Sequence, residues 1–72
     1  MANKSLKIKQ YRRVIKAYAK NNNISLDSAL YDFYNSHTYE KLDKEIGDYH
    51  LEGDEYIADD ISIEMGYLKT IV

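Results

Sequence analysis

The stretch "SLKIKQYRRVIKAYAKNNN", residues 5–23, decides the fold because it has the spacing of a long helix with one apolar side. At 100° per residue its larger apolar residues fall within an arc of roughly 140°, as expected of a helix that faces a core. These residues are Ile8, Tyr11, Val14, Ile15, Tyr18 and Ala19. Ser5 is a suitable N-cap, and the asparagines at 21–23 tolerate the left-handed backbone that ends a helix. We predict a core-facing helix from Ser5 to about Lys20.

The other side of this predicted helix is basic. Five cations form what we call the basic ridge: Lys9, Arg12, Arg13, Lys16 and Lys20. Residues 1–24 carry seven positive charges and no negative ones, whereas residues 25–72 carry three positive and twelve negative ones, which gives the chain its net charge of −2. The ridge is interpreted in three ways: as a solvated helix face, as a surface that steers an acidic protein partner, or as a contact for nucleic acid.

The remainder of the chain predicts three further helices. One covers residues 26–36 with Ser25 as its N-cap, and a short one covers 39–46 with Thr38 as its N-cap. The last runs from 53 or 54 to about Leu68. The apolar residues expected to face the core in the first two are Leu26, Ala29, Leu30, Phe33, Tyr34, Tyr39, Leu42 and Ile46. The predicted fold class is therefore all-α, a small bundle of three long helices and one short helix in a single domain over residues 1–72.

Glycines mark the ends of these helices. Gly47 is predicted to terminate the short helix as its C′ residue. The segment from Gly47 to Gly53 is then a connection, held against the core by Tyr49 and Leu51. Gly66 weakens the final turns of the last helix, because glycine in a helix interior costs about 1 kcal/mol relative to alanine.

Composition restricts the class of protein. The chain has 72 residues, of which 44% are hydrophobic and 31% charged, and it contains no Cys and no Pro. Without cysteine there is no disulfide and no thiolate metal site. No apolar run is long enough for a signal peptide or a membrane span, so we expect a cytoplasmic protein without a membrane partner.

Residue patterns typical of catalysis are missing. His37 and His50 are the only histidines, and neither has the spacing of a zinc-binding motif. No glycine-rich phosphate loop, nucleophile elbow or calcium loop is found. We therefore expect a protein that is not an enzyme and that holds no cofactor and no metal.

The last predicted helix has two apolar sides. Its core stripe contains Ile57, Ala58, Ile61, Met65 and Leu68. Nearly opposite lie Tyr56, Ile63 and Tyr67, with Ile71 adjacent if the helix continues. One interpretation is that this helix packs against others on both sides or kinks at Gly66; the other is that the second side binds a partner protein or a second copy. We favour the partner interpretation.

Nucleic-acid binding is the competing hypothesis. The helices at 26–36 and 39–46 have the arrangement of a helix-turn-helix, in which the second helix would enter the major groove. That helix and its flank carry Glu40, Asp43, Glu45 and Asp48 against two lysines, the wrong sign for approaching phosphates. The alternative function is therefore weak nucleic-acid binding through the basic ridge alone.

Two segments carry a family resemblance: "ALYDFYNSHTYEKL", residues 29–42, and "YHLEGDEYIADDI", residues 49–61. Their spacing of aromatic, hydroxyl and acidic residues resembles a group of short bacterial proteins of unknown function. Members of this group are often encoded beside a predicted ADP-ribosyltransferase-like protein. The resemblance implies a small helical accessory protein, antitoxin-like, and it transfers no active-site residue.

The sequence thus predicts a small non-catalytic module that binds another protein or itself. The predicted contact residues are Tyr56, Ile63 and Tyr67, with Arg12, Arg13 and Lys16 as a secondary charged patch.

Overall fold

A computed structural model describes residues 4–68 of the chain. Four α-helices and one 3₁₀ helix follow one another as α1 (Lys4–Asn22), α2 (Leu26–Tyr34), α3 (His37–Asp43), η1 (Ile46–Leu51) and α4 (Asp54–Glu64). The described residues contain no strand, so the all-α fold class is confirmed. The lengths differ from the prediction, because α1 has 19 residues whereas α2 and α4 have only 9 and 11.

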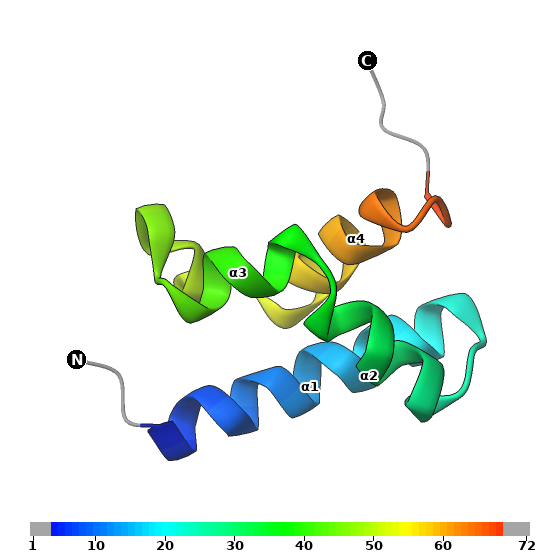
Figure 1. Cartoon of the computed structure of the whole chain (residues 1–72), viewed down its shortest axis with the longest axis horizontal. Helices are drawn as coiled ribbons and strands as arrows, with labels where there is room; N and C mark the ends of the chain where they lie inside the picture. Colours follow the sequence, from blue (N-terminus) through cyan, green and yellow to red (C-terminus); the bar gives the residue numbers. More distant parts are fainter. Residues whose placement is uncertain (1–3, 69–72) are drawn as a thin grey trace.

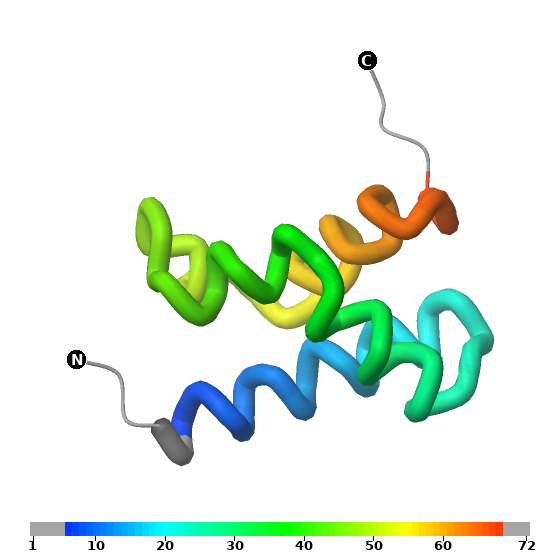
Figure 2. Tube along the Cα trace, viewed as in Figure 1, coloured from blue at the N-terminus to red at the C-terminus, as the bar shows by residue number. Residues whose placement is uncertain are grey.

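The long helix α1 is the element against which α2 and α4 pack (Figure 1). The chain leaves α1, turns back through α2 and α3, and returns along α1 as α4 (Figure 2). The most extensive packing is between α1 and α4, followed by that between α1 and α2. The core consists of Tyr11, Val14, Ile15, Tyr18, Ala19, Ala29, Phe33, Leu42, Ile57, Ala58 and Ile61.

The predicted core stripe of α1 is buried except at its start, where Ile8 is 44% exposed. At about 1.5 Å per residue, α2 is roughly 14 Å long and covers only about half of α1.

The end of α1 follows the prediction, because Asn23 adopts a left-handed conformation with φ of 52°. The N–H groups of Asn23 and Ile24 donate to the carbonyls of Lys20 and Ala19, which closes the helix as a Schellman motif.

For α2 the predicted core residues are only partly correct. Ala29 and Phe33 are fully buried, but Leu26, Leu30 and Tyr34 are 57%, 46% and 48% exposed. Helix α2 packs on α1 and, at its end, on Tyr39 of α3, and within residues 4–68 no second layer covers its other side. Ser25 is the N-cap as predicted, since its hydroxyl accepts from the backbone N–H of Ser28.

The boundaries predicted for the short helix were wrong. Its N-cap is Ser36, whose hydroxyl accepts the backbone N–H of Tyr39 at 3.0 Å. The helix ends at Asp43, and Glu45 takes the left-handed position that follows it. Gly47 is also left-handed, with φ of 57°, but it forms a kink inside the next element. Most of the expected connection is the 3₁₀ helix η1, in which Tyr49 packs on the core while Leu51 is 73% exposed.

Thr38, which we had predicted as the cap, has another role. It lies in the first turn of α3, it is 2% exposed, and its hydroxyl donates to the carboxylate of Glu64 at 3.1 Å. The same carboxylate accepts the backbone N–H groups of His37 and Thr38. A residue at the end of α4 therefore satisfies the free N–H groups at the start of α3, where the helix dipole also favours an anion.

The last helix ends earlier than predicted. Gly66 has a φ of 86° and follows the C-cap residue Met65, so α4 stops at Glu64 instead of continuing to Leu68. The N–H groups of Gly66 and Tyr67 donate to the carbonyls of Ile63 and Ser62, which forms a second Schellman motif. Leu68 is 44% exposed rather than part of the core, and Ile71 lies outside the described residues.

Tyrosine hydroxyls at the edge of the core donate to carboxylates. The pairs are Tyr11 with Asp43 at 3.1 Å, Tyr18 with Asp32 at 2.7 Å, and Tyr49 with Asp60. Burial raises the pKa of each of these tyrosines above its ordinary value, and the hydrogen-bonded carboxylate raises this pKa further. The three pairs join α1 to α3, α1 to α2, and η1 to α4.

The left-handed Glu45 leads to a stability prediction. A residue with a side chain costs roughly 1 kcal/mol or more in this conformation, whereas glycine adopts it readily. Glu45→Gly should therefore raise the free energy of unfolding by about 0.5–1 kcal/mol, measured by urea denaturation. Glu45→Ala is the matched control, because it keeps the backbone strain and also removes the 3.7 Å contact with Lys7. Equal stability of the two variants would contradict the explanation.

Candidate interaction surfaces

The outer face of α4 exposes two large apolar side chains. Tyr56 is 56% exposed and Ile63 is 37% exposed. They are seven residues apart and therefore lie on the same side of the helix. Between them in sequence lies the exposed Asp59. On the inner face of the same helix, Ile57 and Ile61 have no exposed surface, so this helix has one apolar side in the core and another on the molecular surface.

Tyr67 does not extend this face as a helix residue. It follows Gly66, where the chain turns, and its ring meets the ring of Tyr18 edge-on with centroids 6.0 Å apart. Half of Tyr67 remains exposed, at 49%. It is therefore both a surface residue and part of the packing around α1, whereas the ring of Tyr56 meets that of the partly buried Tyr49, with centroids 6.4 Å apart.

The basic ridge is divided between two sides of α1. Arg13 faces α4, where its Nε donates to the carboxylate of Asp54 at 2.8 Å. Arg12 and Lys16 lie toward α2, and neither forms a salt bridge with an acidic residue in the described range 4–68. The three residues predicted as one charged patch therefore do not act as a unit.

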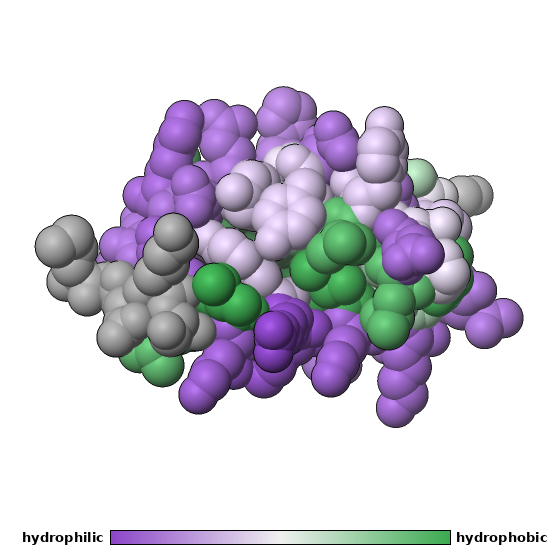
Figure 3. Space-filling view, turned by 60° about the horizontal axis from the view of Figure 1, so that its bottom comes forward, coloured by the Kyte–Doolittle hydropathy of each residue, from purple (hydrophilic) through white to green (hydrophobic). Residues whose placement is uncertain are grey.

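A groove lies between α1 and α2, with a volume of about 360 Å³. Its lining residues are Arg12, Ile15, Lys16, Leu26, Asp27 and Leu30. Figure 3 shows apolar surface gathered over α1 and α2 and bordered by hydrophilic side chains. We refer to these six residues as the α1–α2 groove.

Sequence reasoning missed this groove because it assigned Leu26 and Leu30 to the core. A signal was present in the composition of α2. Six of its nine residues, LDSALYDFY, are apolar or aromatic, which is more than one neighbouring helix buries. Tyr31 lies outside the apolar arc of α2 and is 70% exposed.

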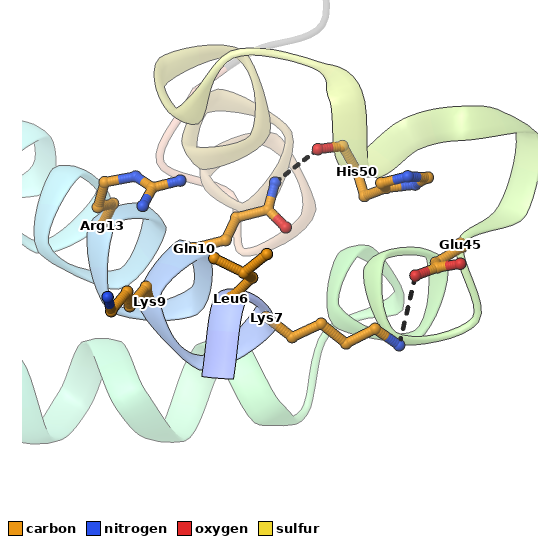
Figure 4. A pocket seen from close by; sticks show the side chains of 7 residues that line it. All are labelled: Leu6, Lys7, Lys9, Gln10, Arg13, Glu45 and His50. Atoms are coloured by element: carbon orange, nitrogen blue, oxygen red, sulfur yellow. Dashed lines mark hydrogen bonds and ion pairs between the residues drawn. The ribbon is translucent and has the colours of Figure 1, made fainter. Parts of the chain in front are cut away.

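A second pocket, of about 260 Å³, lies between the start of α1 and η1 (Figure 4). Its polar groups are largely engaged with each other: Gln10 donates to the carbonyl of His50 at 2.7 Å, and the ammonium of Lys7 lies 3.7 Å from Glu45. The His50 ring points away from Arg13 (Figure 4). Nδ1 of His50 is buried without a hydrogen-bond partner among the described residues, and the cations Lys7 and Arg13 of the same pocket pair with Glu45 and Asp54.

The described residues show no group of three or more His, Asp or Glu side chains arranged to hold a metal ion. None of the helices within residues 4–68 is both long and apolar enough to cross a lipid bilayer. The surfaces that stand out are the outer face of α4 and the α1–α2 groove, so the fold and its surface define a small all-α domain with two exposed apolar sites.

Comparisons of the chain with protein-family models, with curated proteins and with solved structures found no match. The resemblance of residues 29–42 and 49–61 to short bacterial accessory proteins therefore stays a prediction from the sequence.

Proposed function

We propose that this protein is a small non-catalytic interaction module that binds another protein, or a second copy of itself, through the outer face of α4. The observation that carries the proposal is the pairing of Tyr56 and Ile63 on the exposed side of a helix whose other side is fully buried. Tyrosine supplies a large contact area and a polar tip, and it is enriched in the energetically important centres of interfaces.

The surrounding charges favour a protein partner over nucleic acid at this face. Asp59 is exposed between the two apolar residues, and Glu55 is exposed one turn before it. Carboxylates repel phosphates but form hydrogen bonds and ion pairs with the polar rim of a protein interface. Weak nucleic-acid binding by the basic ridge is the competing function. Retention of the protein on a DNA column at about 50 mM salt that is lost by about 200 mM would support that function.

The sequence resemblance suggests which partner to test first. It implies an accessory role beside an ADP-ribosyltransferase-like protein, and a small antitoxin-like protein acts by binding its partner rather than by catalysis. The partner to test is therefore the product of the adjacent gene, together with self-association of the chain.

The experiment is size-exclusion chromatography with light scattering, on the protein alone and mixed with that gene product. We expect a mass above the monomer value of 8.4 kDa in one of the two samples. Tyr56→Ser combined with Ile63→Ser should abolish the complex because both side chains are exposed, while the helical circular dichroism and the melting temperature change little. Tyr67 is left intact because its ring packs against Tyr18.

A matched control is Tyr31→Ser combined with Leu51→Ser. These two side chains are the most exposed large apolar groups, at 70% and 73%, and they lie on other elements. The complex should survive this change. A strict monomer that also ignores the gene product, or equal loss of binding in both double variants, would overturn the proposal.

A further inference from the structure

The α1–α2 groove combines an apolar base with cationic edges. Ile15 is 6% exposed, and beside it Leu26 and Leu30 leave 57% and 46% of their surfaces open. Arg12 and Lys16 line the same groove from α1. Leu26 and Leu30 lie four residues apart on one side of α2, and an apolar patch bordered by polar groups marks a contact site.

The positive charge along the groove is not neutralised within the domain. Arg12 and Lys16 have no salt-bridge partner among residues 4–68, although Arg13, Lys7 and Lys44 each have one. The helix that carries them contains no acidic residue. One carboxylate, Asp27, also lines the groove, on the α2 side. The α1 edge is therefore strongly positive and the base is apolar.

We propose that the α1–α2 groove binds an amphipathic helix of a partner protein, one that carries acidic residues beside its apolar stripe. A helix laid in a groove places side chains at i, i+3 or i+4 and i+7 against the apolar base. Carboxylates flanking that stripe then meet Arg12 and Lys16, and charge-assisted hydrogen bonds of this kind are the strong ones.

Other occupants fit the groove less well. A nucleic-acid backbone would use the two cations but would leave Leu26 and Leu30 exposed and would meet Asp27. A second copy docked groove to groove would place cations against cations, which opposes association. The groove shares no residue with the outer face of α4, so each proposal is tested by its own variants.

The test uses the full chain and a synthetic helical peptide. The peptide has leucines at i, i+4 and i+7, glutamates flanking them, and one tryptophan. Because this protein contains no Trp, fluorescence excited at a wavelength beyond the absorption of its eight tyrosines reports on the peptide alone. We expect saturable binding, weakened about tenfold or more by R12E/K16E, and we expect that variant to bind instead the peptide in which every glutamate is lysine.

The matched control is K9E/K20E. It changes the net charge as much as R12E/K16E does, and both residues are exposed on the same helix, but neither lines the groove. This control should change the affinity less than about twofold. Leu30→Ser tests the apolar part separately and should also weaken binding about tenfold, with circular dichroism used to verify that each variant is folded.

Four results would overturn the proposal. Equal weakening by R12E/K16E and K9E/K20E would show that the peptide responds only to net charge, and absence of saturable binding would remove the site. Competition by duplex DNA for the wild type but not for R12E/K16E would assign the groove to nucleic acid. A mass of the protein alone that falls from dimer to monomer in R12E/K16E would assign it to a second copy.

Discussion

Above pH 10 the protein should lose stability steeply and unfold over about one to three pH units. The three tyrosines whose hydroxyls donate to Asp32, Asp43 and Asp60 are the cause. Burial, and after it the neighbouring carboxylate, raises the pKa of each in the folded protein. Ionisation in place would put a tyrosinate beside a carboxylate.

The sign follows from proton binding. Below the ordinary tyrosine value of about 10, all three groups are protonated in both states and the full stability is present. Above it, the unfolded chain releases protons that the folded chain retains, so the free energy of unfolding falls with rising pH. Each group contributes about 1.4 kcal/mol per pH unit, and three give about 4 kcal/mol per unit. At 0.05–0.15 kcal/mol per residue, a chain of 72 residues has roughly 4–11 kcal/mol to lose.

Two signals followed together measure this effect. Far-ultraviolet circular dichroism should collapse in the same pH interval in which the tyrosinate absorbance of the buried rings appears. Tyr18→Phe is the informative variant, because it keeps the ring and removes one titrating group, so the fall of stability with pH should become about one third shallower. A chain that remains helical after all tyrosinate absorbance has developed would contradict the prediction.

Glu64→Ala should destabilise the domain by about 2–3 kcal/mol, although Glu64 is an exposed residue. Its carboxylate accepts hydrogen bonds from the N–H groups of His37 and Thr38 and from the Thr38 hydroxyl. Because Thr38 is 2% exposed, water replaces these bonds poorly. In a domain of this size the melting temperature should fall by about 10–20 °C, as measured by calorimetry.

The matched control is Asp59→Ala, which removes an exposed carboxylate from the same helix. Asp59 makes no hydrogen bond or salt bridge to another described residue through its side chain, so this change should stay within about 0.5 kcal/mol. The melting temperature of Glu64→Gln should lie between those of the two alanine variants, because the amide oxygen still accepts a hydrogen bond but carries no charge. Similar melting temperatures for the two alanine variants would mean that α3 does not depend on α4 for its start.

The long helix was predictable because its signal is local and periodic. The stripe from Tyr11 to Ala19 is buried as predicted, and Asn23 ends the helix in the left-handed conformation that asparagine tolerates. The core side of α4 was predictable for the same reason, with Ile57 and Ile61 fully buried.

The errors have a common physical origin in tertiary contacts. Periodicity indicates which side of α2 turns inward, but not how wide a face its neighbours cover, so Leu26 and Leu30 were assigned to the core and the groove was missed. Ser36 and Thr38 are both good cap residues. The hydroxyl of Thr38 donates to the carboxylate of Glu64, which is distant in sequence, and Ser36 is the residue that caps the helix. Tyr67 left the predicted stripe because Gly66 turns the chain.

The packing of α4 against α1 also determines when the chain can fold during its synthesis. The residues that close the core over α1, Ile57, Ala58 and Ile61, lie on α4, which follows α1, α2, α3 and η1 in the chain and is therefore translated after them. Until they emerge, the apolar side of α1 has only the short helix α2 and α3 against it. Folding of this domain is therefore completed only after α4 has been synthesised, and a ribosome-associated chaperone has the interval before that in which to bind the uncovered stripe.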